Sequence, residues 1–263
     1  MPFCQSIAAA LLAVITVSLC GGCASNPSNP DPWEKANRFI YNVNDGFDRA
    51  ALKPAADAYV KVVPKPIRQG IGNGFDNLIY LNVIINDFLQ AKWGQGLGDS
   101  GRMAANSVVG IGGVFDVATQ WGLPAHQNDF GITLGKWGAK PGPYLVLPLF
   151  GPSSLRDAPG LLVEYVATPT SYLYLPLAVT LPLGATDIID ARSRADTVMK
   201  FRNDTALDPY VFTRDAYLQY RDARIHEGKP APSTTDQSIY DTDTDSSPMT
   251  APAATQPVTN PGK

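Results

Sequence analysis

The sequence predicts an all-α protein, a bundle of amphipathic helices with a Gly/Pro-rich loop or hairpin at its centre. Apolar residues recur at spacings of three and four along most of residues 31–226, which is the period of a helix with one apolar stripe. Sustained strand alternation occurs nowhere in the sequence. Residues 121–151 are rich in glycine and proline, and the chain of 263 residues contains 23 of each.

Composition narrows the function classes. Charged residues make up 17% of the chain, below the roughly 25% of an average soluble protein, so part of the surface is expected to meet something other than water. The net charge is -3 and no Lys/Arg cluster occurs, which argues against nucleic-acid binding. All three cysteines lie within the first 23 residues, and His126 and His226 are the only histidines. We therefore expect neither a metal site nor a cofactor.

The N-terminus has the pattern of a lipoprotein signal. Ile7–Cys20 is a run of 14 mostly apolar residues, too short for a membrane span, and small residues precede Cys23 as in a bacterial lipobox. We expect residues 1–22 to be a signal peptide, and Cys23 to carry a diacylglycerol and an N-acyl chain on a tether over residues 23–30. An uncleaved anchor and cleavage at another site are the alternatives. Ser25 at the sorting position favours the outer membrane.

The first half of the body is expected to form helices. One starts near Asp31, which can cap it, and runs to about Ala51. Residues 53–65 contain two prolines and are followed by Pro66, which predicts a bend with a short helix. A helix over residues 67–89 follows and becomes apolar on most sides, as when a helix is buried in protein or faces lipid. The glycines of residues 94–101 are expected to end it, with Asp99 or Ser100 capping the next helix.

The second half begins with the central loop or hairpin. Residues 160–181 are almost free of charge but contain prolines at 169 and 176, which predicts two half-length pieces that enter one leaflet or line a cavity. A buried core hairpin is the alternative. Amphipathic helices are expected over Ile188–Met199 and from Asp208 to about His226. The folded domain should end near residue 228, and the polar residues 229–263 predict disorder.

The sequence offers little to an enzyme. Residues 96–101 match GxGxxG, but the pattern before them is helical and not a strand, so we interpret them as a joint between helices. Carboxylate pairs such as Asp187 with Asp190 are typical of solvated helix faces or caps. His126 lies in a loop without a nucleophile beside it in the sequence. We therefore expect no catalytic residues.

A series of short motifs resembles the MlaA/VacJ family of outer-membrane lipoproteins. The matches keep their order over residues 31–226, and the order is more specific than any one motif. They are Asp31-Pro32-x-Glu34-x-x-Asn37-Arg38, Phe88-Leu89-Gln90, Gly110-Ile111-Gly112-Gly113, Phe130-Gly131-x-Thr133-Leu134-Gly135, Gly142-Pro143-Tyr144, Arg156-Asp157 and Asp208-Pro209-Tyr210.

The resemblance implies a ring-like helical body in the inner leaflet of the outer membrane. A channel through the ring would let misplaced phospholipids leave the outer leaflet and pass to a soluble periplasmic lipid-binding protein, and the ring would associate with a trimeric porin. A hairpin near residues 138–144, with Gly138, Gly142 and Tyr144, would influence opening. A headgroup needs a polar strip, for which the candidates are Asn42, Asn44, Asp45, Asp157 and Asp208. The alternatives are a structural, porin-binding lipoprotein without transport and a lipid hydrolase with an unrecognised site.

Overall fold

The computed structural model describes residues 29–168 and 176–227. The expected signal peptide, the lipidated Cys23 and the polar tail over residues 229–263 lie outside the described residues. The bounds of the elements are as follows: α2 Glu34–Phe47, a π-helical turn Asp48–Leu52, α3 Lys53–Val62, α4 Lys65–Leu89, α5 Trp93–Val108, α6 Val117–Gln120, α7 Phe130–Lys136, β1 Tyr144–Leu147, β2 Gly151–Ser154, α8 Gly160–Ala167, α9 Leu177–Arg194, α10 Asp196–Thr205 and α11 Pro209–Ile225.

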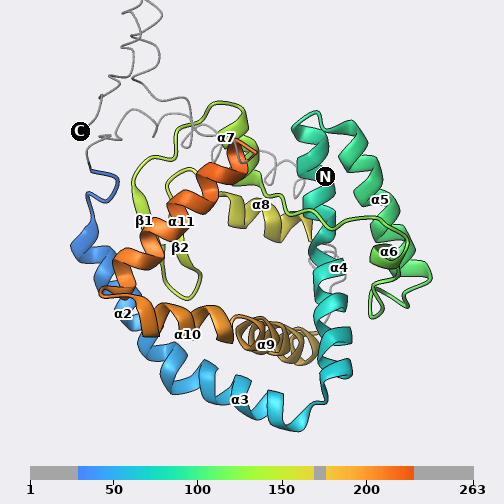
Figure 1. Ribbon diagram of the computed structural model, residues 1–263, viewed down its shortest axis with the longest axis horizontal. Coiled ribbons are helices and arrows are strands. Elements are labelled where there is room, and N and C mark those ends of the chain that lie inside the picture. Colours follow the sequence, from blue (N-terminus) through green and yellow to red (C-terminus); the bar gives the residue numbers. More distant parts are fainter. Residues whose placement is uncertain (1–28, 169–175, 228–263) are drawn as a thin grey trace, which may run out of the picture. The chain divides into compact units, whose positions relative to one another are not determined.

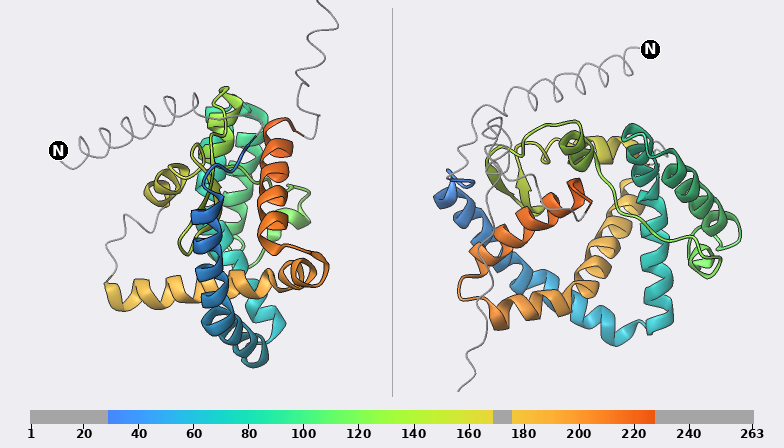
Figure 2. Two further views of the ribbon diagram at one scale, coloured as in Figure 1. Left: turned by 90° about the vertical axis from the view of Figure 1, so that its left-hand side faces the viewer. Right: turned by 45° about the horizontal axis from the view of Figure 1, so that its top comes forward.

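The helices are arranged as a ring, as expected. In Figure 1 α2, α3 and α4 follow one another along its outer edge, and α7, α8 and the hairpin complete the circuit back to α2. Helix α5 packs on the outside of α4, while α9, α10 and α11 lie along the inner side. The edge view in Figure 2 shows that the ring of ribbons is thin and that the first turns of α9 project from it.

The glycine-rich stretch at residues 94–101 does not end a helix, which corrects two expectations. The chain reverses earlier, at Gln90–Lys92, where Ala91 has a φ of 58°, and α5 then runs straight through the glycines. A Cβ on Gly96 would lie 3.0 Å from the Phe88 ring of α4, so this glycine lets the two helices approach closely. The GxGxxG match therefore lies inside a helix, and Asp99 is a buried residue of α5 and no cap.

Two other helix limits differ from the expectation. Trp33 and not Asp31 is the residue before α2, and it makes no side-chain capping bond. The helix expected over Ile188–Met199 is divided between α9 and α10 at Ala195. Asp208 does cap α11, because its carboxylate accepts hydrogen bonds from the amides of Tyr210 and Val211 at 3.0 and 3.2 Å.

The central segment contains the one sheet of the described residues. Strands β1 and β2 form an antiparallel hairpin in which Tyr144 pairs with Ser154 and Leu147 with Gly151. Pro152 is tolerated because a two-stranded hairpin has only edge strands. The amide of Tyr144 also donates to the carbonyl of Pro30 at 2.9 Å, so the chain enters the body along the hairpin.

Candidate functional site

Helix α4 buries polar side chains and exposes apolar ones, which is the reverse of the distribution in a helix of a water-soluble protein. Its buried side chains include Asn77, Asn82, Asn86 and Asp87, while a stripe of large apolar side chains is exposed. That stripe consists of Ile67, Leu78, Ile79, Ile85 and Leu89. Because an apolar helix face gains free energy only when it leaves water, this stripe requires cover from apolar material.

The same inversion holds over the described residues as a whole. Nineteen buried polar or charged side chains outnumber ten buried apolar ones, and 33 large apolar side chains are exposed. On α2, Asn37 is buried while Phe39 is 69% exposed; on α5, Asp99 and Arg102 are buried while Leu97 is 67% exposed. A monomer in water rarely exposes so much apolar surface, so the polar interior and apolar exterior mark an interaction surface.

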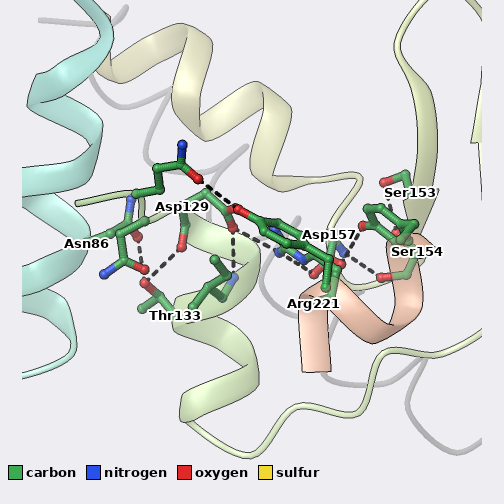
Figure 3. A network of polar contacts seen from close by, with 12 residues as sticks. Asn86, Asp129, Thr133, Ser153, Ser154, Asp157 and Arg221 are labelled. Atoms are coloured by element: carbon green, nitrogen blue, oxygen red, sulfur yellow. Dashed lines mark hydrogen bonds and ion pairs between the residues drawn. The ribbon is translucent and has the colours of Figure 1, made fainter. Parts of the chain in front are cut away.

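A continuous polar network crosses the inner side of the ring between α4 and α11 (Figure 3). The Thr133 hydroxyl of α7 donates to the Asn86 side chain of α4 at 2.7 Å. Asp129 caps α7 and pairs with Arg221 of α11. Arg221 in turn lies 3.0 Å from Asp157, beyond the end of β2. The network thus joins α4, α7, the end of the hairpin and α11, in part through charge-assisted hydrogen bonds.

Asp157 is the most heavily engaged carboxylate of this network. It receives hydrogen bonds from Arg156 at 2.7 Å and from the Tyr217 hydroxyl at 2.7 Å, in addition to the pair with Arg221. Burial alone would raise the pKa of Asp157, but the two guanidinium groups hold it below its ordinary value. Its charge is therefore fixed and compensated, which suits a structural role.

Glu164 of α8 lies next to this network and forms no ion pair with any residue of the described ranges 29–168 and 176–227. Burial raises its pKa to about 7, and the neighbouring carboxylates of Asp129 and Asp157 add to the effect, against the opposing influence of Arg221. We therefore expect Glu164 to change its charge near neutral pH.

A second cluster ties α2 to the hairpin. The Asn37 side chain donates to the Tyr144 carbonyl at 2.9 Å and accepts from the Val146 amide at 2.9 Å, so it bonds to one carbonyl and one amide of β1. It also donates to the Asp31 carboxylate at 2.8 Å, which is buried and bonded to the Tyr210 hydroxyl. One amide thereby links α2, β1 and the start of the body.

A third cluster holds α5 against α4. Asp87 and Asp99 are almost completely buried, and the Tyr80 hydroxyl donates to Asp99 at 2.7 Å. Gln95 and Asn128 both donate to Asp87 at 2.8 Å. Burial, together with the nearby Asp99, raises the pKa of Asp87 to about 6. Asp87 is thus a second group that gains a proton in mildly acidic conditions.

The structure places the five candidates for a polar strip in different environments. Asn44 holds the hairpin turn through the Leu147 carbonyl and the Leu149 amide, both at 2.9 Å. Asp45 forms ion pairs with Arg49 and Arg202. Asp157 belongs to the inner polar network. Asp208 forms an ion pair with Arg38 at 2.8 Å and also caps α11. Asn42 is exposed. Four of the five are therefore already engaged within the protein, and contact with lipid stays a prediction for all five.

The hairpin lies further along the chain than residues 138–144. Gly138 follows the end of α7 with a φ of 93°, and Gly142 has a φ of 67° just before β1, so both glycines shape turns that lead into the hairpin. Tyr144 is fully buried and forms the small aromatic core with Tyr210 and Tyr217. A gating role for these three residues stays a prediction.

The residues that sequence reasoning missed are Asn37, Arg221 and Glu164. Asn37 was named only as part of a family motif, and it is buried in the structure. The available signal was the low charge density combined with many asparagines among apolar residues on residues 37–44 and 73–86. Such a pattern is typical of helices whose polar side faces protein and whose apolar side faces lipid.

The fold and the site together define a helical, ring-shaped protein with a polar interior and a largely apolar surface. Within residues 29–168 and 176–227, no helix combines the length and the apolar character that crossing a bilayer requires. The family model described as MlaA lipoprotein matches residues 29–224. The chain therefore belongs to the MlaA lipoprotein family.

Individual relatives agree with this assignment. The intermembrane phospholipid transport system lipoprotein MlaA of Escherichia coli strain K12 is 34% identical over 233 residues, covering 84% of this chain and 90% of the relative. The protein of the same name from Haemophilus influenzae is 29% identical and covers 86% of this chain and 92% of the relative. A solved structure described as the structural basis for maintenance of bacterial outer membrane lipid asymmetry is similar with a TM-score of 0.65 and 31% identity, over 74% of this chain and 98% of that one.

Proposed function

We propose that this protein is a lipid-transport component and not an enzyme, and that it removes misplaced phospholipids from the outer leaflet of the outer membrane. The observation that carries the proposal is the inversion described above: polar side chains are buried between the elements of the ring, and large apolar side chains are exposed on its surface. The MlaA relatives bear the name of intermembrane phospholipid transport lipoproteins, and the chain covers most of their length.

The geometry supports passage through the ring. The apolar exterior would lie among the acyl chains of one monolayer, because its burial there contributes about 25 cal/mol per Å² of apolar surface. The inner polar side would accept a headgroup, which cannot cross an apolar barrier without a large desolvation cost. A phospholipid would then leave through an opening to the periplasmic side without mixing into the inner leaflet.

The anchor and the partners belong to the same proposal. Cys23 would carry the diacylglycerol and the N-acyl chain that hold the protein in the outer membrane, facing the periplasm, since each buried methylene contributes about 0.8 kcal/mol. A soluble periplasmic lipid-binding protein would receive the phospholipid. A trimeric outer-membrane porin would give the ring access to the outer leaflet.

Deletion of the gene tests the proposal. We expect deletion cells to expose more phosphatidylethanolamine to a membrane-impermeant, amine-reactive label and to become sensitive to detergent with chelator. Wild-type protein supplied from a plasmid should reverse both effects. Unchanged surface labelling in the deletion cells would contradict the proposal, and a purified protein without co-purified phospholipid would favour a structural, porin-binding role.

A further inference from the structure

A small cationic cavity lies between the start of α4 and the end of α9. Its volume is about 240 Å³, and its lining includes Lys65 and Arg68 of α4 and Ser193 and Arg194 of α9. It lies apart from the inner polar network, whose residues do not line it. None of the site residues predicted from the sequence lines it, and Asp190, expected on a solvated helix face or at a cap, is buried in its wall.

The cavity holds uncompensated positive charge. Arg194 is neutralised by Asp190 and Asp76, each at 2.9 Å, and the Tyr59 hydroxyl satisfies the other Asp190 oxygen at 3.0 Å. By contrast, Lys65 and Arg68 have no carboxylate partner among residues 29–168 and 176–227. The cavity therefore carries a net charge that favours an anion.

Arg68 adds an unfulfilled hydrogen-bonding group. Its Nε atom is buried without a hydrogen-bond partner in the described part of the chain. A buried donor without an acceptor costs free energy, and a charged donor costs more than a neutral one. A guanidinium group matches the paired oxygens of a phosphate better than any other side chain.

Backbone packing keeps the Asp190–Arg194 pair at the wall of the cavity. A Cβ on Gly72 would lie 3.0 Å from the Asp190 carboxylate and 3.5 Å from the Arg194 guanidinium carbon, so the glycine lets this pair contact α4 directly. The Ser193 hydroxyl donates to the Asp190 carbonyl at 2.7 Å and holds the last turn of α9 in place. The wall is thus fixed by protein contacts, and Lys65 and Arg68 are the lining cations that pair with no carboxylate in the part of the chain that the structure describes.

An apolar cavity adjoins the cationic one on the neighbouring side of α4. Its volume is about 550 Å³, and Ile67, Ile71 and Phe115 are among its lining residues. The two cavities share Gln69 and Asn73. A cationic cavity beside an apolar one fits a molecule that joins an anionic group to a hydrocarbon chain.

We propose that Lys65 and Arg68 bind the phosphate group of a phospholipid, with an acyl chain in the adjoining apolar cavity. This site rests on the proposed function, since it names where the transported lipid is held. The shared chemistry of a lipid headgroup and a free phosphate is the phosphate anion, and the apolar cavity favours the lipid. The complementary charge comes from two side chains, one of which, Arg68, is half-buried and lacks a partner for its Nε atom in residues 29–168 and 176–227.

The test uses the full lipidated protein in detergent micelles. Binding of dihexanoyl-phosphatidylglycerol, sn-glycerol 3-phosphate and inorganic phosphate is measured by calorimetry for the wild type, Arg68→Gln, Lys65→Gln and the double variant. Arg68→Lys keeps the positive charge but loses the planar guanidinium group that can donate two parallel hydrogen bonds to a phosphate. Lys35→Gln serves as the matched control, because it removes one exposed positive charge and Lys35 does not line the cavity.

We expect the wild type to bind the short-chain lipid at least tenfold more tightly than inorganic phosphate. Each single Gln variant should weaken binding of the lipid about tenfold, which corresponds to about 1.4 kcal/mol, with a smaller loss in Arg68→Lys and none in Lys35→Gln. Unchanged lipid binding in the double variant overturns the site. Equal affinity for inorganic phosphate assigns the cavity to a free ion and overturns the lipid proposal.

The outcome is separable from the proposed function. If the double variant binds lipid normally while gene deletion still raises surface labelling, the site fails and the transport function stands. If deletion has no effect on surface labelling, the transport function fails whatever the cavity binds. Equal thermal unfolding of the variants and the wild type ensures that lost binding reflects the site.

Discussion

Asn37 makes the contact between α2 and the hairpin depend on a single amide side chain. Substitution Asn37→Ala removes three hydrogen bonds and leaves the Tyr144 carbonyl, the Val146 amide and the Asp31 carboxylate without this partner. We expect a loss of about 2–4 kcal/mol in the free energy of unfolding, because buried polar groups left unpaired cost about 1–3 kcal/mol each. Denaturant unfolding in micelles measures the change.

Asn42 on the same helix provides the control. Its side chain is exposed, so Asn42→Ala should change the free energy of unfolding by less than about 0.5 kcal/mol. Equal effects of the two substitutions would contradict the structural role of Asn37.

Glu164 is expected to make stability depend on pH. Its pKa is raised to about 7 in the folded protein, against about 4.3 in an unfolded chain, so the folded protein binds a proton that the unfolded chain releases between these values. Stability should therefore rise as pH falls from 8 to 5, and Asp87 should add to this rise below about pH 6. Each unit of pKa difference corresponds to about 1.4 kcal/mol.

Melting temperatures between pH 8 and pH 5 check this expectation. Glu164→Gln mimics the protonated group, so it should raise the melting temperature at pH 8 and reduce the rise toward pH 5. Below about pH 4 stability should fall again, because Asp116 and Glu227 have pKa values lowered to about 2 and lose their partners when protonated. A profile that is parallel in Glu164→Gln and the wild type would show that another group is responsible.

At the residue level the sequence predicted that asparagines and aspartates are important, but it did not predict the partner of each one. The start of the last helix at Asp208 was correctly predicted from Pro209 and the helical pattern that follows, whereas contact between Asp208 and lipid stays a prediction. Asn44, Asp45 and Asp157 were selected as polar groups without a known partner. Asp45 and Asp157 each have one nearby partner, Arg49 and Arg156, but the partners that tie them and Asn44 into the ring come from segments about 60 to 160 residues further along the chain. Such pairings depend on the assembled ring and leave no local pattern.

The α4–α5 pair shows at the level of elements how glycine can serve packing inside a helix. Gly96 faces Phe88, whereas a Cβ on Gly98 would meet no atom within 4 Å. We expect Gly98→Ala to stabilise the protein by about 0.5–1 kcal/mol, since alanine is the better helix former. Gly96→Ala should give no gain or a loss, because the Phe88 ring must move. Thermal unfolding of the two variants compares them directly; a gain in both would contradict close packing at Gly96.

Element limits were predictable where the helical period is uninterrupted. The period gave α4 to within two residues of its start, and Pro64 and the residues before it correctly predicted the bend after α3. The period does not reveal which side of a helix faces protein, and it fails where glycines replace apolar residues. These are the physical reasons for the error at α5.

The distribution of side chains on the whole molecule predicts membrane binding without the acyl anchor. A chain that begins at residue 24 should float with vesicles of phosphatidylethanolamine and phosphatidylglycerol. Phe39→Glu and Leu97→Glu should each weaken this partition about tenfold or more, because burying a large apolar side chain contributes about 1.5–3 kcal/mol. Thr205→Glu, at an exposed polar position, should have little effect. Equal flotation of all variants would contradict contact between these apolar side chains and lipid.

The ring itself was expected only from the resemblance to the family. Periodicity predicts helices but not their order around a circuit, because the closing contacts join α2 to β1 and α4 to α7 and α8. The hairpin supplies the first of these contacts through Asn37, and the family motif around residues 142–144 marks its start.

The inversion of polar and apolar side chains has a consequence for how this chain acquires its native state. Exposing the apolar side chains of the folded protein to water costs free energy, so folding and binding to a membrane are thermodynamically linked. Any amphiphile that coats the exterior shifts this equilibrium, and a stability measured in one surfactant applies to that surfactant alone. In water, therefore, we expect the chain to persist as a folded monomer only when another molecule covers this exterior.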